Sequence, residues 1–234
     1  MIPLGPRINL FGAPAFYKSI TESTMEDLAL LALENYPSGT LVMAGVQSAG
    51  KGQMGRKWEG ESGLNLAFSF LLRERFALPP SLLWGLAVSQ YLDTLGVNSQ
   101  IKWPNDVLVK GEKISGILVH RRGDVTITGI GLNVKQREFP LDLRRPATSL
   151  WLQGITLEPL EILEGLLKEI QYVMNLSEPR RFVQDRLWCL GEPISLSVTE
   201  GVTVVGILKG LGDQGQALLE TIDGPREVFS GETP

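Results

Sequence analysis

Hydrophobic positions recur along the chain with two periods, and each period predicts a kind of element. Apolar residues three and four apart favour helices over residues 25–35, 81–95, 156–176 and 178–188. Alternating or continuous apolar runs favour strands that begin near residue 17 and near residue 101, and strands over residues 40–47, 64–72 and 125–132. A short helix or turn is expected over residues 142–152, and residues 1–16 read as an extended lead-in broken by prolines.

From Leu190 onward the pattern changes to short apolar runs separated by glycine turns. Strands are predicted over residues 193–198, 202–208, 216–221 and 227–229. Such a short segment buries too little surface to be very stable alone, so we expect a small β-barrel or open sheet docked on the first domain. The chain is therefore divided into a domain of residues 1–188 and a small β domain of residues 189–234.

The composition indicates a globular chain without a broad nucleic-acid-binding surface. Of the 234 residues, 43% are hydrophobic, and the formal net charge is −4. The single cysteine, Cys189, cannot form an internal disulfide, which favours a reducing compartment. No apolar run reaches the roughly 18 residues of a membrane span. We therefore expect a cytoplasmic protein.

Residues 44–58, A-G-V-Q-S-A-G-K-G-Q-M-G-R-K-W, form a glycine-rich cationic stretch. Glycine lets the backbone approach a ligand closely, and exposed N–H groups together with cations bind anions. Part of the stretch matches the phosphate-loop pattern G-x-x-x-x-G-K, but Gly52 stands where Ser or Thr is required, and a strand rather than a helix follows. We predict a loop that wraps a phosphorylated ligand; a glycine-rich surface turn is the alternative.

A second group of polar residues lies among apolar neighbours, around a predicted turn and hairpin: Lys102, Asn105, Asp106 and Lys113. A charge beside a buried strand needs a partner or a ligand. The alternative is that Asn105 and Asp106 only shape the turn. In the strand predicted over 125–132, Gly129 and Gly131 indicate the close approach of a ligand or of another backbone.

Ser23 and Thr24 precede the helix predicted over residues 25–35. Their hydroxyls are expected to cap it, with Glu26 and Asp27 in its first turn. A cap requires only one hydroxyl, so the other is left for a different role.

Several motifs, taken together and in order, resemble those of biotin protein ligases. The matching segments are G-K-G-Q-M-G-R-K-W (50–58), K-W-P-N-D (102–106), Lys113 with G-I-L-V (116–119), G-I-G-L-N (129–133) and A-T-S-L (147–150). Their order and spacing extend over nearly the whole chain. The resemblance is to the short form of the family, which lacks the N-terminal DNA-binding domain.

The resemblance implies an α+β fold with a mixed, largely antiparallel sheet and packed helices, as in the class II synthetase-like biotin and lipoate ligase domains. It implies that the carboxylate of biotin attacks the α-phosphate of ATP, which gives biotinyl-AMP and pyrophosphate. A lysine of a biotin carboxyl carrier protein then attacks the acyl carbon. ATP and biotin are the implied substrates, with Mg²⁺, and neither DNA nor a membrane is an implied partner. A homodimer is left open.

The resemblance also implies roles for particular residues. Lys113 would bridge the carboxylate and the α-phosphate, with Arg56 and Lys102 at the phosphates and Asp106 on Mg²⁺, because two anions that repel each other must be brought together by cations. The residues expected to bind biotin are Ser23, Thr24, Met25, Gln47, Lys51, Gly52, Gln53, Lys113, Gly116 and Leu118, with Ile117 and Trp103 along the ring. The residues expected at ATP or the adenylate are Gly50, Gly55, Arg56, Trp58 (stacked on adenine), Asn105, Gly131 and Asn133.

Three positions depart from the family pattern. Met25 stands in place of an asparagine and offers no amide, while Lys51 and Gln53 replace arginines. Lysine keeps the charge without the planar fork, and glutamine loses the charge. We therefore expect this loop to retain biotinyl-AMP less tightly than the arginine version does.

Two alternative functions are left open: a lipoate- or octanoate-type acyl ligase, and a non-catalytic biotin-binding protein. K-W-P-N-D together with G-R-K-W argues against the first. Biotin-dependent exchange of pyrophosphate into ATP distinguishes an enzyme from a binding protein.

Overall fold

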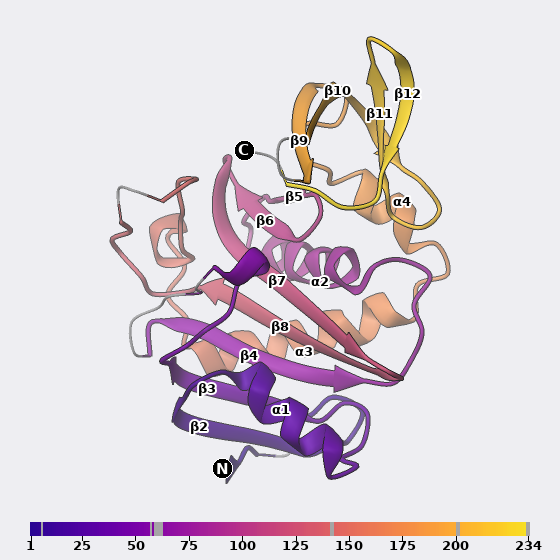
Figure 1. Ribbon diagram of the computed structural model, residues 1–234. Coiled ribbons are helices and arrows are strands. Elements are labelled where there is room, and N and C mark those ends of the chain that lie inside the picture. The colour runs from indigo at the N-terminus through magenta and orange to yellow at the C-terminus, as the bar shows by residue number, and fades with distance from the viewer. Residues whose placement is uncertain (6, 57, 59–62, 141–142, 200–201, 233–234) are drawn as a thin grey trace.

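The computed structural model describes residues 1–5, 7–56, 58, 63–140, 143–199 and 202–232. Its centre is an eight-stranded sheet in the order β1-β2-β3-β4-β8-β7-β6-β5 (Figure 1). The strands are β1 (Ile2–Pro3), β2 (Ala15–Thr21), β3 (Leu41–Gln47), β4 (Asn65–Leu72), β5 (Gln100–Lys102), β6 (Asp106–Val109), β7 (Glu112–Arg122) and β8 (Val125–Asn133). Only β2 and β3 pair in parallel among these neighbours, so the expected mixed and largely antiparallel sheet is confirmed.

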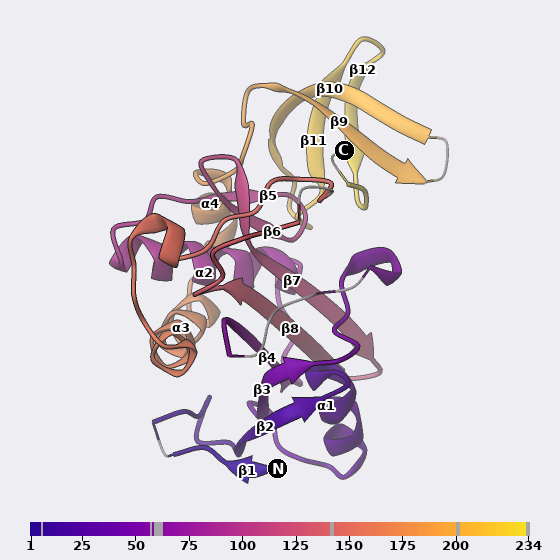
Figure 2. The same ribbon diagram turned by 90° about the vertical axis from the view of Figure 1, so that its left-hand side faces the viewer.

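Helices cover both faces of this sheet (Figures 1 and 2). Helix α1 (Thr24–Leu33) packs on one face, because Met25, Leu28 and Leu31 form a stripe at helical spacing against the sheet. Helices α2 (Pro80–Thr94) and α3 (Pro159–Met174) cover the other face, where they share the main core with the sheet. No helix in the described part of the chain has the length and apolarity that crossing a membrane requires.

The helix predicted over residues 178–188 is shorter than expected. Helix α4 spans Pro179–Gln184, and the residues after it pair with the edge strand β5. Ile101 N donates to Arg186 O at 2.8 Å, and Trp188 N donates to Ile101 O at 2.9 Å. The sheet edge therefore takes the backbone groups that a longer helix would have used. The segment predicted over 142–152 begins outside the described residues and contains a 3-10 turn at Trp151–Gln153.

The C-terminal part forms a second, four-stranded antiparallel sheet in the order β12-β11-β10-β9. Its strands are β9 (Pro193–Thr199), β10 (Val202–Leu211), β11 (Ala217–Thr221) and β12 (Gly224–Val228). Within the described residues β9 and β12 do not pair, so this small β unit is an open sheet rather than a closed barrel.

The small sheet is packed against the large domain, as expected. Its apolar residues, including Leu196 and Leu208, belong to the main core. Trp103 Nε1 donates to Gly215 O at 3.0 Å and ties the two parts together. Because the core is continuous, the boundary at residue 188 stays a prediction.

Candidate functional site

Two adjoining cavities lie where the glycine-rich loop crosses β7 and β8. We call them the closed cavity, with about 50 Å³ of free volume, and the open cavity, with about 760 Å³. Both are lined by Gly52, Gln53, Trp58, Asn105 and Lys113. A ligand that fills both would therefore pass beneath the loop and beside Lys113.

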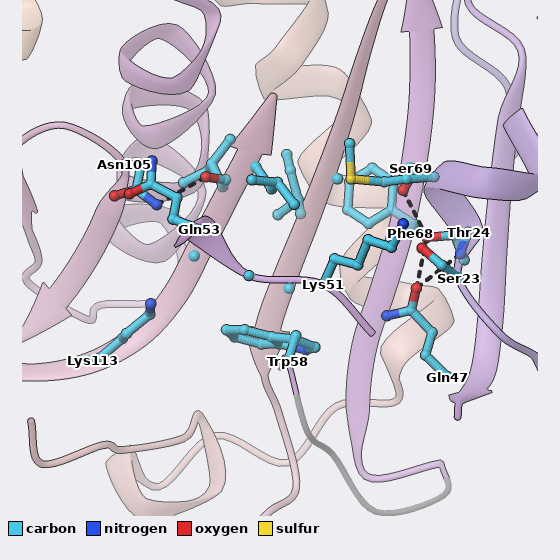
Figure 3. Close-up of a pocket in the computed structure, with 18 residues that line it drawn as sticks. Ser23, Thr24, Gln47, Lys51, Gln53, Trp58, Phe68, Ser69, Asn105 and Lys113 are labelled. Atoms are coloured by element: carbon cyan, nitrogen blue, oxygen red, sulfur yellow. Dashed lines mark hydrogen bonds between the residues drawn. The ribbon is translucent and has the colours of Figure 1, made fainter. Parts of the chain in front are cut away.

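One end of the closed cavity is polar (Figure 3). Gln47 Oε1 accepts from the backbone N of Thr24 at 2.9 Å and from its Oγ1 at 3.1 Å. Thr24 Oγ1 also lies 2.7 Å from Ser69 Oγ. These bonds fix the three side chains relative to one another, so this end is rigid before any ligand arrives.

Ser23 stands at the N-cap position of α1, but its side chain makes no capping bond. The capping role expected for its hydroxyl is therefore wrong. The residue is only 2% exposed, and its Oγ has no hydrogen-bond partner among the described residues. A buried hydroxyl without a partner costs about 1–3 kcal/mol. Since Ser23 lines the closed cavity, a ligand there is its available partner.

The remaining wall of the closed cavity is largely apolar, with Phe68, Ile117 and Ile130 among its residues. Met25 packs over β8: a Cβ placed on Gly129 would lie 3.0 Å from Met25 Sδ. The cavity is thus an apolar slot between the hydrogen-bonding end at Ser23 and the junction where Asn105 and Lys113 stand.

The indole of Trp58 covers the glycines of β7 and β8. A Cβ on Gly131 would lie 2.2 Å from a ring carbon of Trp58, and a Cβ on Gly116 would lie 3.2 Å from another. Gly131 does have a close neighbour, but it is a side chain and not the ligand or backbone that was expected. Small-molecule pockets usually measure roughly 300–1,000 Å³. The indole and the loop must therefore shift before the closed cavity can admit a ligand.

The hairpin between β6 and β7 presents Lys113. Lys110 and Gly111 form its tight turn, with φ values of 53° and 83°. Lys113 Nζ lies 2.7 Å from Asp106 Oδ1 and 5.7 Å from the centre of the Trp58 ring. Its ammonium group therefore stands where the two cavities meet.

The backbone of Lys113 is held by the A-T-S-L segment. Lys113 N donates to Pro146 O at 2.8 Å, and Thr148 N donates to Lys113 O at 2.9 Å. Asn133 Nδ2 donates to Thr148 O at 2.9 Å, and so braces the same segment. Residues 146–148 thus form a backbone clamp that fixes the base of the lysine.

Asn105 and Asn133 border the open cavity while holding backbone groups. Asn105 Nδ2 donates to Ile117 O at 3.0 Å, and Ile117 N donates to Asn105 O at 2.9 Å. The amide nitrogens of both asparagines are therefore engaged in positioning strands. Their expected contacts with a nucleotide stay predictions.

Lys102 and Asp106 are buried beside Lys113, at 8% and 9% exposure. Lys102 Nζ lies 3.8 Å from Asp106 Oδ2. Burial lowers the pKa of Lys102 to about 8, although the negative charge of Asp106 acts in the opposite direction. An incoming phosphate would favour the charged form of this lysine.

The two loop cations with described contacts reach acids on opposite sides of the site. Lys51 forms an ion pair with Glu26 of α1. Arg56 forms an ion pair with Glu232, near the C-terminus, and Arg144 Nη1 lies 2.7 Å from the other oxygen of that carboxylate. Arg56, Arg144 and Glu232 all line the open cavity.

Of the predicted site residues, only Gly50, Gly55 and Trp103 lie outside both cavity linings. Gly50 O accepts from Trp58 N at 2.9 Å, so it anchors the loop. Gly55 has φ +74° and makes a turn. Trp103 faces the C-terminal sheet instead of the ring site that was expected. Residue 57 of the loop lies outside the described residues.

Several lining residues escaped the sequence analysis. Those with a polar or charged group are Ser69, Gln136, Glu138, Arg144, Arg145 and Glu232. The R-R pair before Pro146 was only a weak signal, because the chain carries such pairs at 121–122, 144–145 and 180–181 and only the second lines these cavities. Nothing in the sequence around Glu232 connects it to the glycine-rich loop.

The carboxylate expected at Mg²⁺, Asp106, lies between two lysines. The described residues contain no group of three or more His, Cys, Asp or Glu side chains that would hold a metal by themselves. The donor set therefore fits a Mg²⁺ that is held mainly by substrate phosphates.

The fold and the site together define a class: a small-molecule-activating domain whose apolar slot opens, beside a lysine, into a cationic cavity. The model of the biotin/lipoate A/B protein ligase family matches residues 17–136. The bifunctional ligase/repressor BirA of Bacillus subtilis is 31% identical over 99% of this chain and 77% of its own. The biotin–[acetyl-CoA-carboxylase] ligase of Mycobacterium tuberculosis is 29% identical over 92% of this chain and 88% of its own.

Comparison with solved structures leads to the same family. The biotin protein ligase from Aquifex aeolicus in complex with biotin and ATP is 33% identical, with a TM-score of 0.83 over 94% of this chain and 97% of that one. The chain belongs to the biotin/lipoate A/B protein ligase family.

Proposed function

We propose that this chain is a biotin protein ligase, which activates biotin as biotinyl-AMP with ATP and transfers it to a lysine of a biotin carboxyl carrier protein. The observation that carries the proposal is the unpartnered hydroxyl of Ser23 at the polar end of an apolar slot. Family membership and the similarity to ligases that bind biotin and ATP support it.

Biotin matches the closed cavity in its chemistry. Its fused rings are largely apolar, and its ureido head both donates and accepts hydrogen bonds. Ser23 Oγ is available to donate to the ureido oxygen, while Thr24 and Gln47 are already fixed beside it. Because the buried Ser23 hydroxyl gains a hydrogen-bond partner only when a ligand binds, the site favours a substrate that carries a ureido head.

The reacting groups would meet at Lys113. With the ureido head at the Ser23 end, the valerate carboxylate extends toward the junction of the two cavities, where Lys113 stands. Its ammonium would neutralise the carboxylate and the α-phosphate as they approach, and stabilise the charge that develops. Asp106 holds this ammonium in place in the meantime.

The triphosphate would lie in the open cavity, which Arg56, Lys102 and Arg144 line. Mg²⁺ would arrive with ATP, bound by phosphate oxygens and by Asp106, and would neutralise part of their charge. The indole of Trp58 would shift enough to uncover the closed cavity, stay near Gly131 and stack on adenine, and the loop would then exclude water from the adenylate.

A lipoate or octanoate substrate fits this site less well. Neither acid carries a ureido group at the far end of its chain, so the Ser23 hydroxyl would stay buried without a partner. The cost of about 1–3 kcal/mol corresponds to roughly 5- to 150-fold in affinity. A carrier protein as acceptor and a cytoplasmic location belong to the same proposal.

Biotin-dependent exchange of labelled pyrophosphate into ATP tests the proposal directly. The chain should catalyse this exchange with biotin and not with lipoate or octanoate. Ser23→Ala should raise the KM for biotin about tenfold, since it removes one buried hydrogen bond. Ser38→Ala is the matched control, because that hydroxyl bonds Glu74 and the backbone N of Arg73, outside both cavity linings. Exchange that is absent, or that is driven equally well by lipoate, would refute the proposal.

A further inference from the structure

Glu232 holds an unusual position for a residue so close to the C-terminus. Its carboxylate lies in the open cavity and contacts Arg56 through one oxygen and Arg144 through the other. The Glu232 side chain is only 12% exposed, while those of Arg56 and Arg144 are 46% and 50% exposed. An acid from the C-terminal sheet is thus seated between two guanidinium groups of the large domain.

The backbone of Glu232 is fixed independently of its side chain. Ser197 N donates to Glu232 O at 2.8 Å, and Glu232 N donates to Ser197 O at 3.0 Å. This bridge attaches residue 232 to β9 of the small sheet. The carboxylate can therefore leave the two arginines by rotation of its side chain, without loss of this anchor.

A carboxylate between two guanidinium groups has the chemistry of a bound phosphate. Both present oxygens to the same planar donors, and both neutralise the same positive charge. The same cavity is lined by Lys102 and Lys113. The cations that would receive a triphosphate are thus already in contact with a negative group that belongs to the protein.

We propose that the Glu232 carboxylate is an internal occupant of the site for the terminal phosphates of ATP, and that nucleotide or pyrophosphate displaces it. This rests on the proposed function, since it takes the open cavity as the triphosphate site. Before ATP binds, Glu232 neutralises Arg56 and holds the glycine-rich loop against the small sheet. After adenylation, its return competes with pyrophosphate and promotes release of that product.

Lys51 and Glu26 provide a comparison within the same loop. Their side chains are 45% and 47% exposed, and Glu26 is outside both cavity linings. Exposed pairs of this kind contribute little. The pair of Arg56 with Glu232 is less exposed on the acid side and lies inside the cavity, so of these two loop pairs only this one competes directly with a phosphate.

The test measures binding of inorganic pyrophosphate with Mg²⁺ to the full chain by calorimetry. Glu232→Gln removes the charge and keeps the shape, so its Kd for pyrophosphate should be about three- to tenfold lower than that of the wild type. Glu220→Gln, an exposed acid on β11 of the same sheet, is the matched control and should leave the Kd unchanged. Arg144→Gln should raise the Kd, because it removes a phosphate donor.

An alternative role for Glu232 gives the opposite result. If this acid is a permanent brace that positions Arg56 and Arg144 for ATP, Glu232→Gln will weaken pyrophosphate binding. A Kd that is raised or unchanged in Glu232→Gln would overturn the inference, and so would a lack of pyrophosphate binding in both proteins. If Glu232→Gln does not fold, Glu232→Asp serves as the test. Aspartate is shorter and reaches the arginines less well, so this variant should also lower the Kd for pyrophosphate. Calorimetry needs neither biotin nor carrier, so a failure of biotin-dependent exchange remains a separate outcome.

Discussion

The closed cavity and the open cavity differ in how their polar groups are held. In the closed cavity, Thr24, Gln47 and Ser69 bond one another from α1, β3 and β4, and Ser23 is buried beside them. In the open cavity, Arg56 and Arg144 come from irregular segments and remain half exposed. The polar groups of the closed cavity are thus built into the sheet and α1, whereas these two arginines of the open cavity lie on irregular segments.

This difference has an energetic reason. A buried polar group left without a partner costs about 1–3 kcal/mol, so it must be placed accurately to be of use. Exposed ion pairs contribute about 0–1 kcal/mol and exchange partners readily. We infer that the closed cavity determines which acid is activated, and that the open cavity controls entry and exit of phosphates. The four predictions that follow test this division.

Lys113 belongs to both cavities, so its loss should have the largest effect. Lys113→Gln should lower the rate of biotin-dependent pyrophosphate exchange about 100- to 1,000-fold, because it removes the charge at the developing anhydride. Single-turnover formation of biotinyl-AMP is the measurement. Lys168→Gln, on the exposed face of α3, is the control for loss of a lysine charge. A loss of less than tenfold would place the chemistry elsewhere.

Gly131→Ala tests the cover of the closed cavity. The new Cβ would meet the Trp58 ring at 2.2 Å and displace the indole. The KM for ATP should rise about tenfold, the amount expected for loss of a stacked base. Trp58→Ala should have a similar effect, and adding Gly131→Ala to it should change little more. Additive effects of the two substitutions would mean that Gly131 acts independently of the indole.

Gln53→Arg adds a cation at the border of the two cavities. Gln53 lines both, so an arginine there should hold the phosphate of biotinyl-AMP and slow its release about fivefold. Release is followed by trapping the intermediate as it leaves a preloaded enzyme. Gln100→Arg, at the exposed start of β5, is the control. An unchanged release rate would show that this position does not govern retention.

The pH dependence should show the smallest effect. Because burial lowers the pKa of Lys102 to about 8, this lysine loses its charge as the pH rises through that value. The kcat/KM for ATP should therefore fall about threefold between pH 7.5 and 8.5, since this parameter reports the free enzyme. Lys102→Arg stays charged throughout and should flatten the profile. An identical fall in Lys102→Arg would assign it to another group.

Much of the site was predictable, because several of its parts are local. The hairpin follows from Lys110-Gly111 and brings Lys113 beside Asp106 within one β-turn-β unit. The glycines at 129 and 131 predicted close neighbours, and only the structure identified them as Met25 and Trp58. Ser23 was noted as a helix cap, but its hydroxyl makes no capping bond and lies buried beside Thr24, whose partners Gln47 and Ser69 come from strands distant in sequence.

The sequence by itself predicted most of the elements and the chemistry of the loop and the hairpin, because these depend on periodicity and on neighbours a few residues away. The tertiary structure decided which groups meet. Arg56 and Glu232 are 176 positions apart, and they contact each other only because the small sheet packs on the large domain and carries residue 232 into the open cavity. No local pattern encodes such a contact, since it results from the burial of a shared core.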